Sequence, residues 1–343
     1  MNAYQRVMGA FAGHKIDRVP VIPQIRDWCL GYAGYTITDM MTNAQRYAFS
    51  QFFCQRVLGY DAVFDLVGVS AESEAMGSKV TYSDTMTPSV TAPAIKDYAT
   101  DLERLPIPNP YADGRLPLIL KGIGILNELS KGEVPVIGYL QAPFRHACML
   151  RGPENAMRDL FKNRSQMERL LEVATESLIP YGKALVKAGV DIIFITDPVA
   201  SGDALSTRQW EQFAYPYIKR LIASIKECSP VKIILHICGD TSDRLETFVS
   251  LGIDGMSLDE KVDLGYARKV MGDKICLIGN VSPSKTLYLG TTADVEEESR
   301  LCIEKAGRDG YFILCSGCMI TGPVPPANIK AMVTAAEKYG RYD

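Results

Sequence analysis

The chain has few histidines and no long apolar runs, and each shortage restricts what it can do. Three histidines among 343 residues leave little room for a mechanism built on several imidazoles. No apolar run reaches the roughly 20 residues that a membrane-spanning helix needs, and the N-terminal segment lacks the apolar core of a secretion signal. We therefore expect a cytoplasmic protein that does not enter a membrane.

The chain also lacks an excess of charge of either sign. Its 37 basic and 40 acidic residues give a net charge of −3, so it has no basic field for nucleic acid, which we exclude as a partner. Nine cysteines, an odd number in a chain without a secretion signal, indicate reduced thiols in place of a disulfide framework. Hydrophobic residues are abundant, at 47% of the total, which is enough for a large buried core.

Short apolar runs alternate with longer helical patterns along the chain. Eight of these runs are typical of strands: 19–24, 61–66, 135–141, 191–196, 232–237, 254–258, 274–279 and 311–314. Helix signals lie between them, such as the capping boxes that begin at Ser165 and Ser206. Continuous apolar strands alternating with helices predict a parallel sheet covered on both faces. We expect one (β/α)₈ TIM barrel over residues 1–343, with an inserted hairpin after the second strand and an insertion of about 67–134.

Nearly every predicted strand ends in a polar or metal-binding side chain. In barrels of this type the chemistry sits at the carboxyl ends of the strands. We therefore expect these residues to line one mouth of the barrel: Gln24, Asp65, Gln141, Asp197, His236, Cys238, Asp259, Glu260, Asn280, Cys315 and Cys318.

A histidine and two cysteines among them suggest a metal site. His236 and Cys238 stand one residue apart at the end of the run 232–237, and Cys318 follows a later run. One imidazole and two thiolates suit Zn²⁺, and three protein ligands leave a position open for substrate, as in catalytic sites. Structural zinc knuckles group their ligands within a few residues, whereas here only a rigid fold can bring Cys318 to the other two. Cys315 forms a Cys-x-x-Cys pair with Cys318 and is the alternative ligand.

Two carboxylates are predicted catalytic residues of this site. Glu260 is expected to fill the fourth metal position when substrate is absent, and the alternative is an acid that hydrogen-bonds beside Asp259. Metal-bound histidine usually donates its second ring N–H to a carboxylate or carbonyl. We expect Asp197 to be that partner, and the alternative is a hydrogen bond unrelated to the metal. Of the other histidines, His14 is expected at the surface and His146 in a hydrogen bond at a helix start.

With these residues in place, the chain resembles the uroporphyrinogen decarboxylase superfamily, and within it the zinc methyltransferases that exchange methyl groups with a corrinoid protein. The resemblance spans essentially the whole chain and is strongest in residues 235–241, 257–263, 277–281 and 317–318. It implies a TIM barrel with zinc held by His236, Cys238 and Cys318, in preference to Cys315. It also implies that methylcobamide comes on a partner protein, because the chain lacks the Asp-x-His-x-x-Gly motif of corrinoid carriers.

The resemblance implies a zinc-dependent methyltransferase that moves a methyl group between a corrinoid protein and a thiol. The alternative within the same chemistry is a demethylating enzyme, which takes the methyl group from an aryl methyl ether or another methylated small molecule. Decarboxylases of the superfamily carry an arginine-rich segment after the first strand and lack the metal cysteines. Here residues 24–29 contain one arginine, Arg26, so uroporphyrinogen decarboxylation is disfavoured. A zinc-binding barrel without turnover is the remaining alternative.

Overall fold

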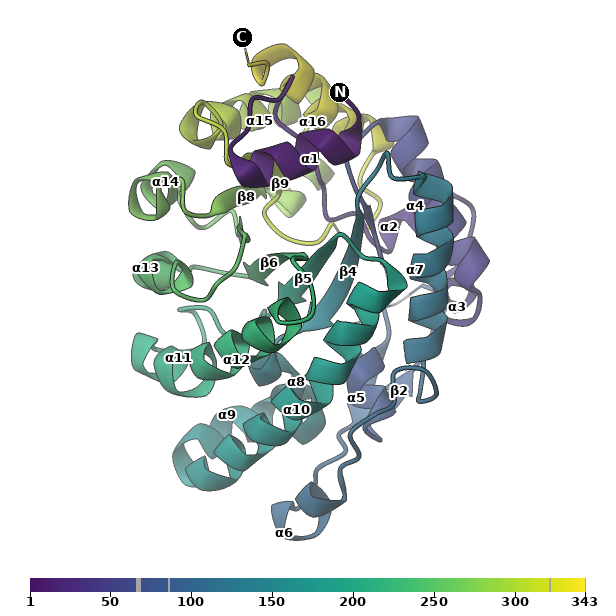
Figure 1. Cartoon of the computed structure of the whole chain (residues 1–343), viewed down its shortest axis with the longest axis vertical. Helices are drawn as coiled ribbons and strands as arrows, with labels where there is room; N and C mark the ends of the chain where they lie inside the picture. Colours follow the sequence, from purple (N-terminus) through teal and green to yellow (C-terminus); the bar gives the residue numbers. More distant parts are fainter. Residues whose placement is uncertain (66–68, 86, 321, 343) are drawn as a thin grey trace.

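A curled parallel sheet forms the centre of the computed structural model, which describes residues 1–65, 69–85, 87–320 and 322–342. Its seven strands lie in the order β1-β4-β5-β6-β7-β8-β9 and make a half-barrel (Figure 1). They are β1 (Val63–Phe64), β4 (Val136–Gln141), β5 (Ile192–Thr196), β6 (Lys232–Ile237), β7 (Gly255–Leu258), β8 (Cys276–Val281) and β9 (Phe312–Ser316). All are parallel, so their carboxyl ends meet at one edge.

These seven strands lie where the apolar runs predict them, within two residues at each described end. Leu66, the predicted end of the second run, lies outside the described residues. The first run, 19–24, is not a regular strand, although it lies between β9 and β1. Ile22 N donates to Leu314 O at 2.9 Å on one side, and Asp61 N donates to Val21 O at 2.7 Å on the other. Pro20 and Pro23 have no N–H, which interrupts the ladder.

Helices precede, connect and follow the strands and cover the outer face of the sheet (Figure 1). Before β4 they are α1 (Ala3–Ala12), α2 (Trp28–Tyr32), α3 (Ile37–Thr42), α4 (Ala44–Leu58), α5 (Ala71–Ala75), α6 (Tyr98–Asp101) and α7 (Leu116–Ser130). After β4 they are α8 (Pro143–Arg151), α9 (Pro153–Lys162), α10 (Arg164–Ala188), α11 (Thr207–Phe213), α12 (Tyr215–Lys226), α13 (Leu245–Phe248), α14 (Leu264–Met271), α15 (Thr292–Ala306) and α16 (Pro326–Tyr339), with a π-helical segment at Pro283–Tyr288 and 3₁₀ turns at Leu102–Arg104 and Ser242–Arg244. Within the described ranges, no helix is long and apolar enough to cross a membrane.

The helix signals in the sequence have mixed outcomes. Ser206 caps α11 with the predicted capping box, in which its side chain accepts from Gln209 N. Ser165 does not cap α10, because that helix begins one residue earlier, at Arg164. Asn163 therefore takes the N-cap position, and it makes no side-chain cap bond.

A two-stranded antiparallel sheet stands apart from the main sheet. It consists of β2 (Lys79–Thr81) and β3 (Ser89–Ala92), with Val80 opposite Val90. Residues 67 and 68, at the start of the proposed insertion 67–134, lie outside the described residues. The same stretch contains α7, which packs against α4, so the extent of the insertion stays a prediction.

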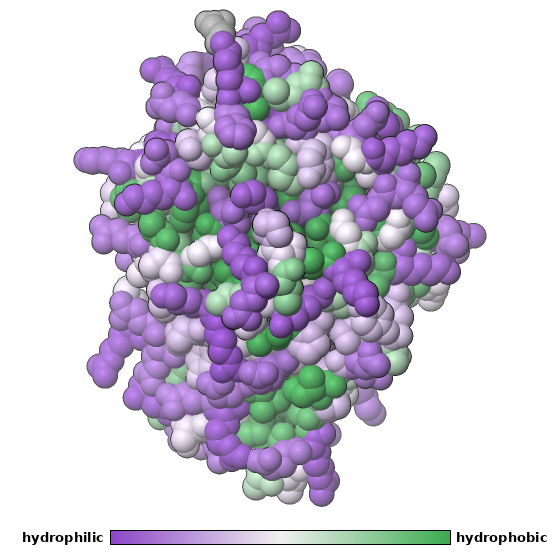
Figure 2. Space-filling view, viewed as in Figure 1, coloured by the Kyte–Doolittle hydropathy of each residue, from purple (hydrophilic) through white to green (hydrophobic). Residues whose placement is uncertain are grey.

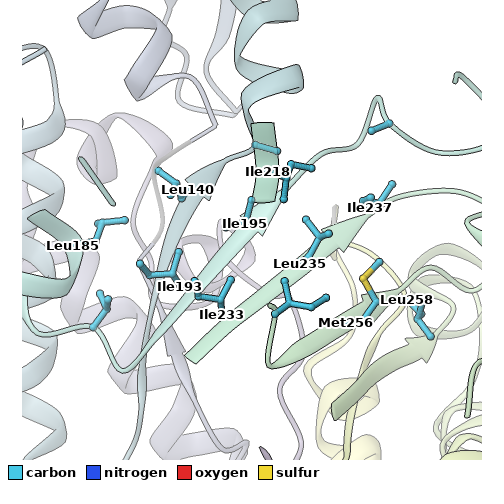
Figure 3. Close-up of a cluster of buried hydrophobic side chains, with 14 of the residues drawn as sticks. Leu140, Leu185, Ile193, Ile195, Ile218, Ile233, Leu235, Ile237, Met256 and Leu258 are labelled. Carbon is cyan, nitrogen blue, oxygen red and sulfur yellow. The ribbon is translucent and has the colours of Figure 1, made fainter. Parts of the chain in front are cut away.

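Alternate residues of each central strand face opposite sides of the sheet. The outer row packs toward Leu185 of α10 and Ile218 of α12, as Figure 3 shows. On β5 and β6 this row consists of Ile193, Ile195, Ile233, Leu235 and Ile237. The inner row, including Phe194 and Ile234, forms a second apolar cluster with Phe11 of α1. The face seen in Figure 2 is mostly hydrophilic, with separate apolar patches. The inner row matters for function because His236 continues it at the carboxyl end of β6.

Candidate metal centre

His236 on β6, Cys238 just beyond it and Cys318 after β9 meet at the carboxyl ends of the strands. His236 Nε2 lies 3.2 Å from Cys238 Sγ, which lies 3.2 Å from Cys318 Sγ. The three ligand atoms fall within 4.8 Å of one another. Ligands about 2.0 to 2.3 Å from a tetrahedral Zn²⁺ stand roughly 3.5 Å apart, so these donors fit that ion. His236 is buried and both cysteines are half-buried, which leaves one side open.

The second nitrogen of His236 identifies its tautomer. Nδ1 lies 3.2 Å from the Ser257 carbonyl oxygen and 3.0 Å from Ser257 Oγ. Because a carbonyl only accepts, Nδ1 carries the hydrogen and the Nε2 lone pair faces the sulfurs. Gln24 Nε2 donates to Ser257 Oγ at 3.3 Å. The Phe194 ring stacks on the imidazole, with the two ring centroids 5.7 Å apart. Ser257 therefore positions the imidazole, a role that the sequence did not indicate.

The two thiols form a coupled pair. The hydrogen bond between them lowers the pKa of Cys318 and, together with burial, raises the pKa of Cys238. The first proton of the pair therefore leaves readily and the second reluctantly. A divalent cation between the sulfurs would favour both thiolates.

Backbone hydrogen bonds hold the segment that carries Cys318. Gly317 N donates to Val281 O at 2.8 Å, and Ile320 N donates to Gln24 O at 2.9 Å. Cys315 lies outside the group, buried in the inner apolar cluster, where burial raises the pKa of its thiol to about 12. The structure thus brings Cys318, and not Cys315, to the other two donors.

Glu260 lies beside Cys318 without joining the three donors. A Cβ on Gly317 would stand 2.7 Å from Glu260 Oε2, so the glycine leaves room for this carboxylate. Ser282 Oγ donates to Glu260 Oε1 at 3.5 Å. Burial, followed by the charges of Asp259 and Cys318, raises the pKa of the Glu260 carboxyl. A ligand role for Glu260 stays a prediction.

Asp197 does not contact the His236 ring, so that part of the expectation is wrong. Its N–H donates to His236 O at 2.9 Å, and Thr196 is the register partner of His236. The next side chain, that of Asp197, therefore falls on the opposite side of the sheet. Its carboxylate is fully buried, and no side chain in the described ranges donates to it; the backbone N–H groups of Val199 and Arg145 are the donors that face it. Burial raises its pKa to about 8, against the opposing effect of the Arg145 charge. A catalytic role for Asp197 stays a prediction.

The other strand-end residues bind backbone or one another. Asp259 accepts from Gly239 N at 2.8 Å, and Asn280 Nδ2 donates to Asp259 O at 2.9 Å. These bonds support the turn that follows Cys238. Asp65 accepts from the N–H of Tyr139 on β4 at 2.7 Å.

The two remaining histidines, His14 and His146, are not part of the group formed by His236, Cys238 and Cys318. Gln141 donates to the buried Glu72 at 2.9 Å, and His146 lies in the first turn of α8, which begins at Pro143. His146 is fully buried between Ser73 Oγ and Met76 Sδ, each 3.1 Å from a ring nitrogen. His14 is exposed, as predicted.

Fold and site together define a class: a parallel α/β half-barrel with a His-Cys-Cys candidate metal centre at the carboxyl ends of its strands. The family model described as uroporphyrinogen decarboxylase (URO-D) matches residues 2–339. The chain therefore belongs to the uroporphyrinogen decarboxylase family.

Relatives within this family differ in their named activities. The chain is 30% identical over 340 residues to methylcobamide:CoM methyltransferase MtaA of Methanosarcina barkeri, covering 97% of each. It is also 30% identical over 357 residues to a uroporphyrinogen decarboxylase of Trichlorobacter lovleyi, covering 97% of this chain and 98% of the relative. A solved methyltransferase from Methanosarcina mazei matches with a TM-score of 0.90 at 29% identity, over 99% of each chain. The identity to MtaA and to this decarboxylase is the same, 30%, so the assignment of an activity rests on the site.

Proposed function

We propose that this protein is a zinc-dependent methyltransferase that moves a methyl group between a corrinoid protein and a small thiol. The observation that carries the proposal is the convergence of His236, Cys238 and Cys318, whose donor atoms lie within 4.8 Å of one another. This donor set suits a catalytic zinc, and a relative is named for methylcobamide and CoM. Arg26 is the one arginine of the segment 24–29, too few to grip the carboxylates of a porphyrinogen.

The three donors would hold Zn²⁺, which supplies the charge that keeps an incoming thiol deprotonated. Ser257 keeps the Nε2 lone pair of His236 aimed at that position. In the transfer a sulfur–carbon bond forms and the cobalt–carbon bond breaks with its electron pair left on cobalt. The proton of the thiol leaves to a base. We propose that Glu260 takes that proton, or fills the fourth position before substrate arrives, and its position against Gly317 beside Cys318 supports this.

We further propose that the corrinoid arrives on a separate protein that docks over the mouth, with the β2–β3 hairpin as part of its docking surface. The segment 19–24, hydrogen-bonded to β9 and to Asp61 just before β1, is inferred to complete an eight-stranded barrel beneath that mouth. A cytoplasmic location agrees with the reduced thiols that the chemistry needs.

The second candidate is the demethylating reaction, and one cavity favours it. A cavity of about 660 Å³ is lined by Trp28, Tyr32 and Tyr35, among others; His236, Cys238 and Cys318 do not line it, and Ile320, two residues after Cys318, connects it to the site. Aromatic walls suit an aryl methyl ether as the methyl donor. In that case the methyl group would pass from the ether oxygen to the corrinoid.

The deciding experiment is the anaerobic visible spectrum of methylcobalamin incubated with zinc-loaded protein and a thiol. We expect loss of the methyl–cobalt band that requires both zinc and the thiol. Absence of the reaction with every thiol would reject transfer to thiols. Reduced cobalamin would then be offered aryl methyl ethers, whose demethylation would establish the second candidate.

A further inference from the structure

A buried arginine next to the candidate metal centre is short of acceptors. Arg26 is 7% exposed, and its Nη2 donates to Met319 Sδ at 2.7 Å. In the described part of the chain, Nε and Nη1 have no hydrogen-bond partner. A thioether sulfur accepts hydrogen bonds only weakly, and buried cations are normally paired. This guanidinium therefore has unused capacity for an anion.

The guanidinium contacts the segment of chain that carries Cys318. Met319, its acceptor, directly follows Cys318 in the chain. The Tyr139 ring centroid is 4.9 Å from the Arg26 guanidinium carbon and 5.9 Å from that of Arg145. Two cations therefore share the face of one aromatic ring.

Three charged groups near Arg26 have polar acceptors or donors as partners, whereas Nε and Nη1 of Arg26 have none. Arg145 Nη1 donates to Thr196 Oγ1 at 3.1 Å. Asp27, the residue after Arg26, accepts from Thr87 Oγ1 at 2.5 Å. The buried Glu72 accepts from Gln141 Nε2 at 2.9 Å. No carboxylate in the described ranges forms an ion pair with Arg26.

The subsite is held in place, and residues next to it in the chain line a cavity. Gln51, which is fully buried, donates from Nε2 to Arg26 O at 2.9 Å and so holds the backbone of the arginine. Asp27 and Ile320, which follow Arg26 and Met319 in the chain, line the cavity of about 660 Å³. The Met319 side chain is flexible enough to move aside when a better acceptor enters.

We propose that Arg26 is a specificity-determining residue that binds an acidic group of the small substrate, a sulfonate or a carboxylate, in place of the Met319 thioether. This inference rests on the proposed function. A guanidinium presents a planar pair of donors to two acid oxygens, and charge-assisted bonds of this kind are among the strongest in proteins. Because Met319 adjoins Cys318, the acid would lie a short spacer away from the reacting sulfur.

The test compares thiols of similar length that differ in charge. 2-Mercaptoethanesulfonate and 3-mercaptopropionate are acidic, 2-mercaptoethanol is neutral and 2-mercaptoethylamine is cationic. Each is offered with methylcobalamin to the zinc-loaded wild type and to Arg26→Gln. We expect the wild type to prefer the acidic thiols. Arg26→Gln should raise KM for the acidic thiols about ten- to hundredfold, whereas KM for the neutral thiol should stay nearly unchanged. The preferred acid distinguishes sulfonate from carboxylate recognition.

Lys261→Gln is the matched control, because it removes one positive charge near the mouth. Its ammonium is 2.8 Å from Asp203, and its side chain is 57% exposed. We expect this variant to keep the preference of the wild type. Loss of the preference in Lys261→Gln, or its survival in Arg26→Gln, would overturn the assignment to Arg26.

A binding measurement separates this inference from the proposed function. Ethanesulfonate and propionate have no thiol, so their binding by calorimetry does not depend on methyl transfer. Binding to the wild type that is lost in Arg26→Gln supports the subsite, even if no thiol is methylated. Equal binding to both proteins, or binding to neither, overturns it.

Discussion

Removing the Ser257 hydroxyl should weaken zinc binding without touching a ligand. The substitution is Ser257→Ala, which deletes one of the two acceptors of His236 Nδ1. The Ser257 carbonyl, 3.2 Å from Nδ1, stays in place because it belongs to the backbone. The imidazole therefore keeps its tautomer but loses the closer of its two restraints, at 3.0 Å.

The size of the effect follows from what remains. Loss of the outer partner of a metal-bound histidine costs roughly 10- to 100-fold in metal affinity. Because the carbonyl remains and Gln24 loses only a long hydrogen bond of 3.3 Å, we expect the lower end of that range. The expected loss is about tenfold, or about 1.4 kcal/mol.

The assay is zinc competition against a chromophoric chelator, with thermal unfolding of the metal-free proteins measured in parallel. Ser299→Ala is the matched control, because Ser299 is fully buried and, within the described ranges, its hydroxyl has no partner. Wild-type zinc affinity in Ser257→Ala would refute the assigned role of the hydroxyl. An equal loss in Ser299→Ala would attribute the effect to general packing.

Two further predictions concern single side chains. Cys318→Ala should lose stoichiometric zinc and methyl transfer together. Cys315→Ala should retain zinc, because Cys315 is buried outside the group of three donors. Elemental analysis of both variants checks this, and stoichiometric zinc in Cys318→Ala would contradict it. The pKa of about 8 for Asp197 in the folded protein lies above the value near 4 that an aspartate has in an unfolded chain. Between these two pH values the folded protein therefore holds one proton more than the unfolded chain. Its free energy of unfolding falls as pH rises through this range, by up to about 1.4 kcal/mol per pH unit. Asp197→Asn should remove that contribution, and urea unfolding of the metal-free proteins at about pH 5 and about pH 8 would contradict it if both show the same pH dependence.

The sheet was predictable because strands buried on both faces are continuous apolar runs. Lys232–Ile237 is the clearest case, where predicted and observed strands coincide. The run 19–24 is equally apolar, but Pro20 and Pro23 cannot donate to a neighbouring strand. Hydrophobicity therefore located this segment beside the sheet but could not establish its hydrogen bonding.

The candidate site was predictable where residue type and position at a strand end agree, as for His236 and Cys318. Ser257 could not be chosen from the sequence, because serine is common and its contact depends on the register that places it opposite His236. Asp197 misled for a related reason. Asp197, like His236, lies at the carboxyl end of a strand, but the register partner of His236 is Thr196. Asp197 is the next residue and therefore faces the other side of the sheet.

The backbone hydrogen bonds of Gly317 and Ile320, on either side of Cys318, determine how far metal binding is coupled to folding. His236 and Cys238 belong to or adjoin a buried strand, and Cys318 lies between anchored residues, so loading an ion orders little new chain. Zinc fingers behave in the opposite way, because their binding energy is spent on folding. Here chelation should leave the secondary structure intact, and almost all of the binding free energy should be expressed as affinity. Such a rigid cradle can be emptied and refilled, which makes cobalt(II) substitution a practical spectroscopic probe of the site.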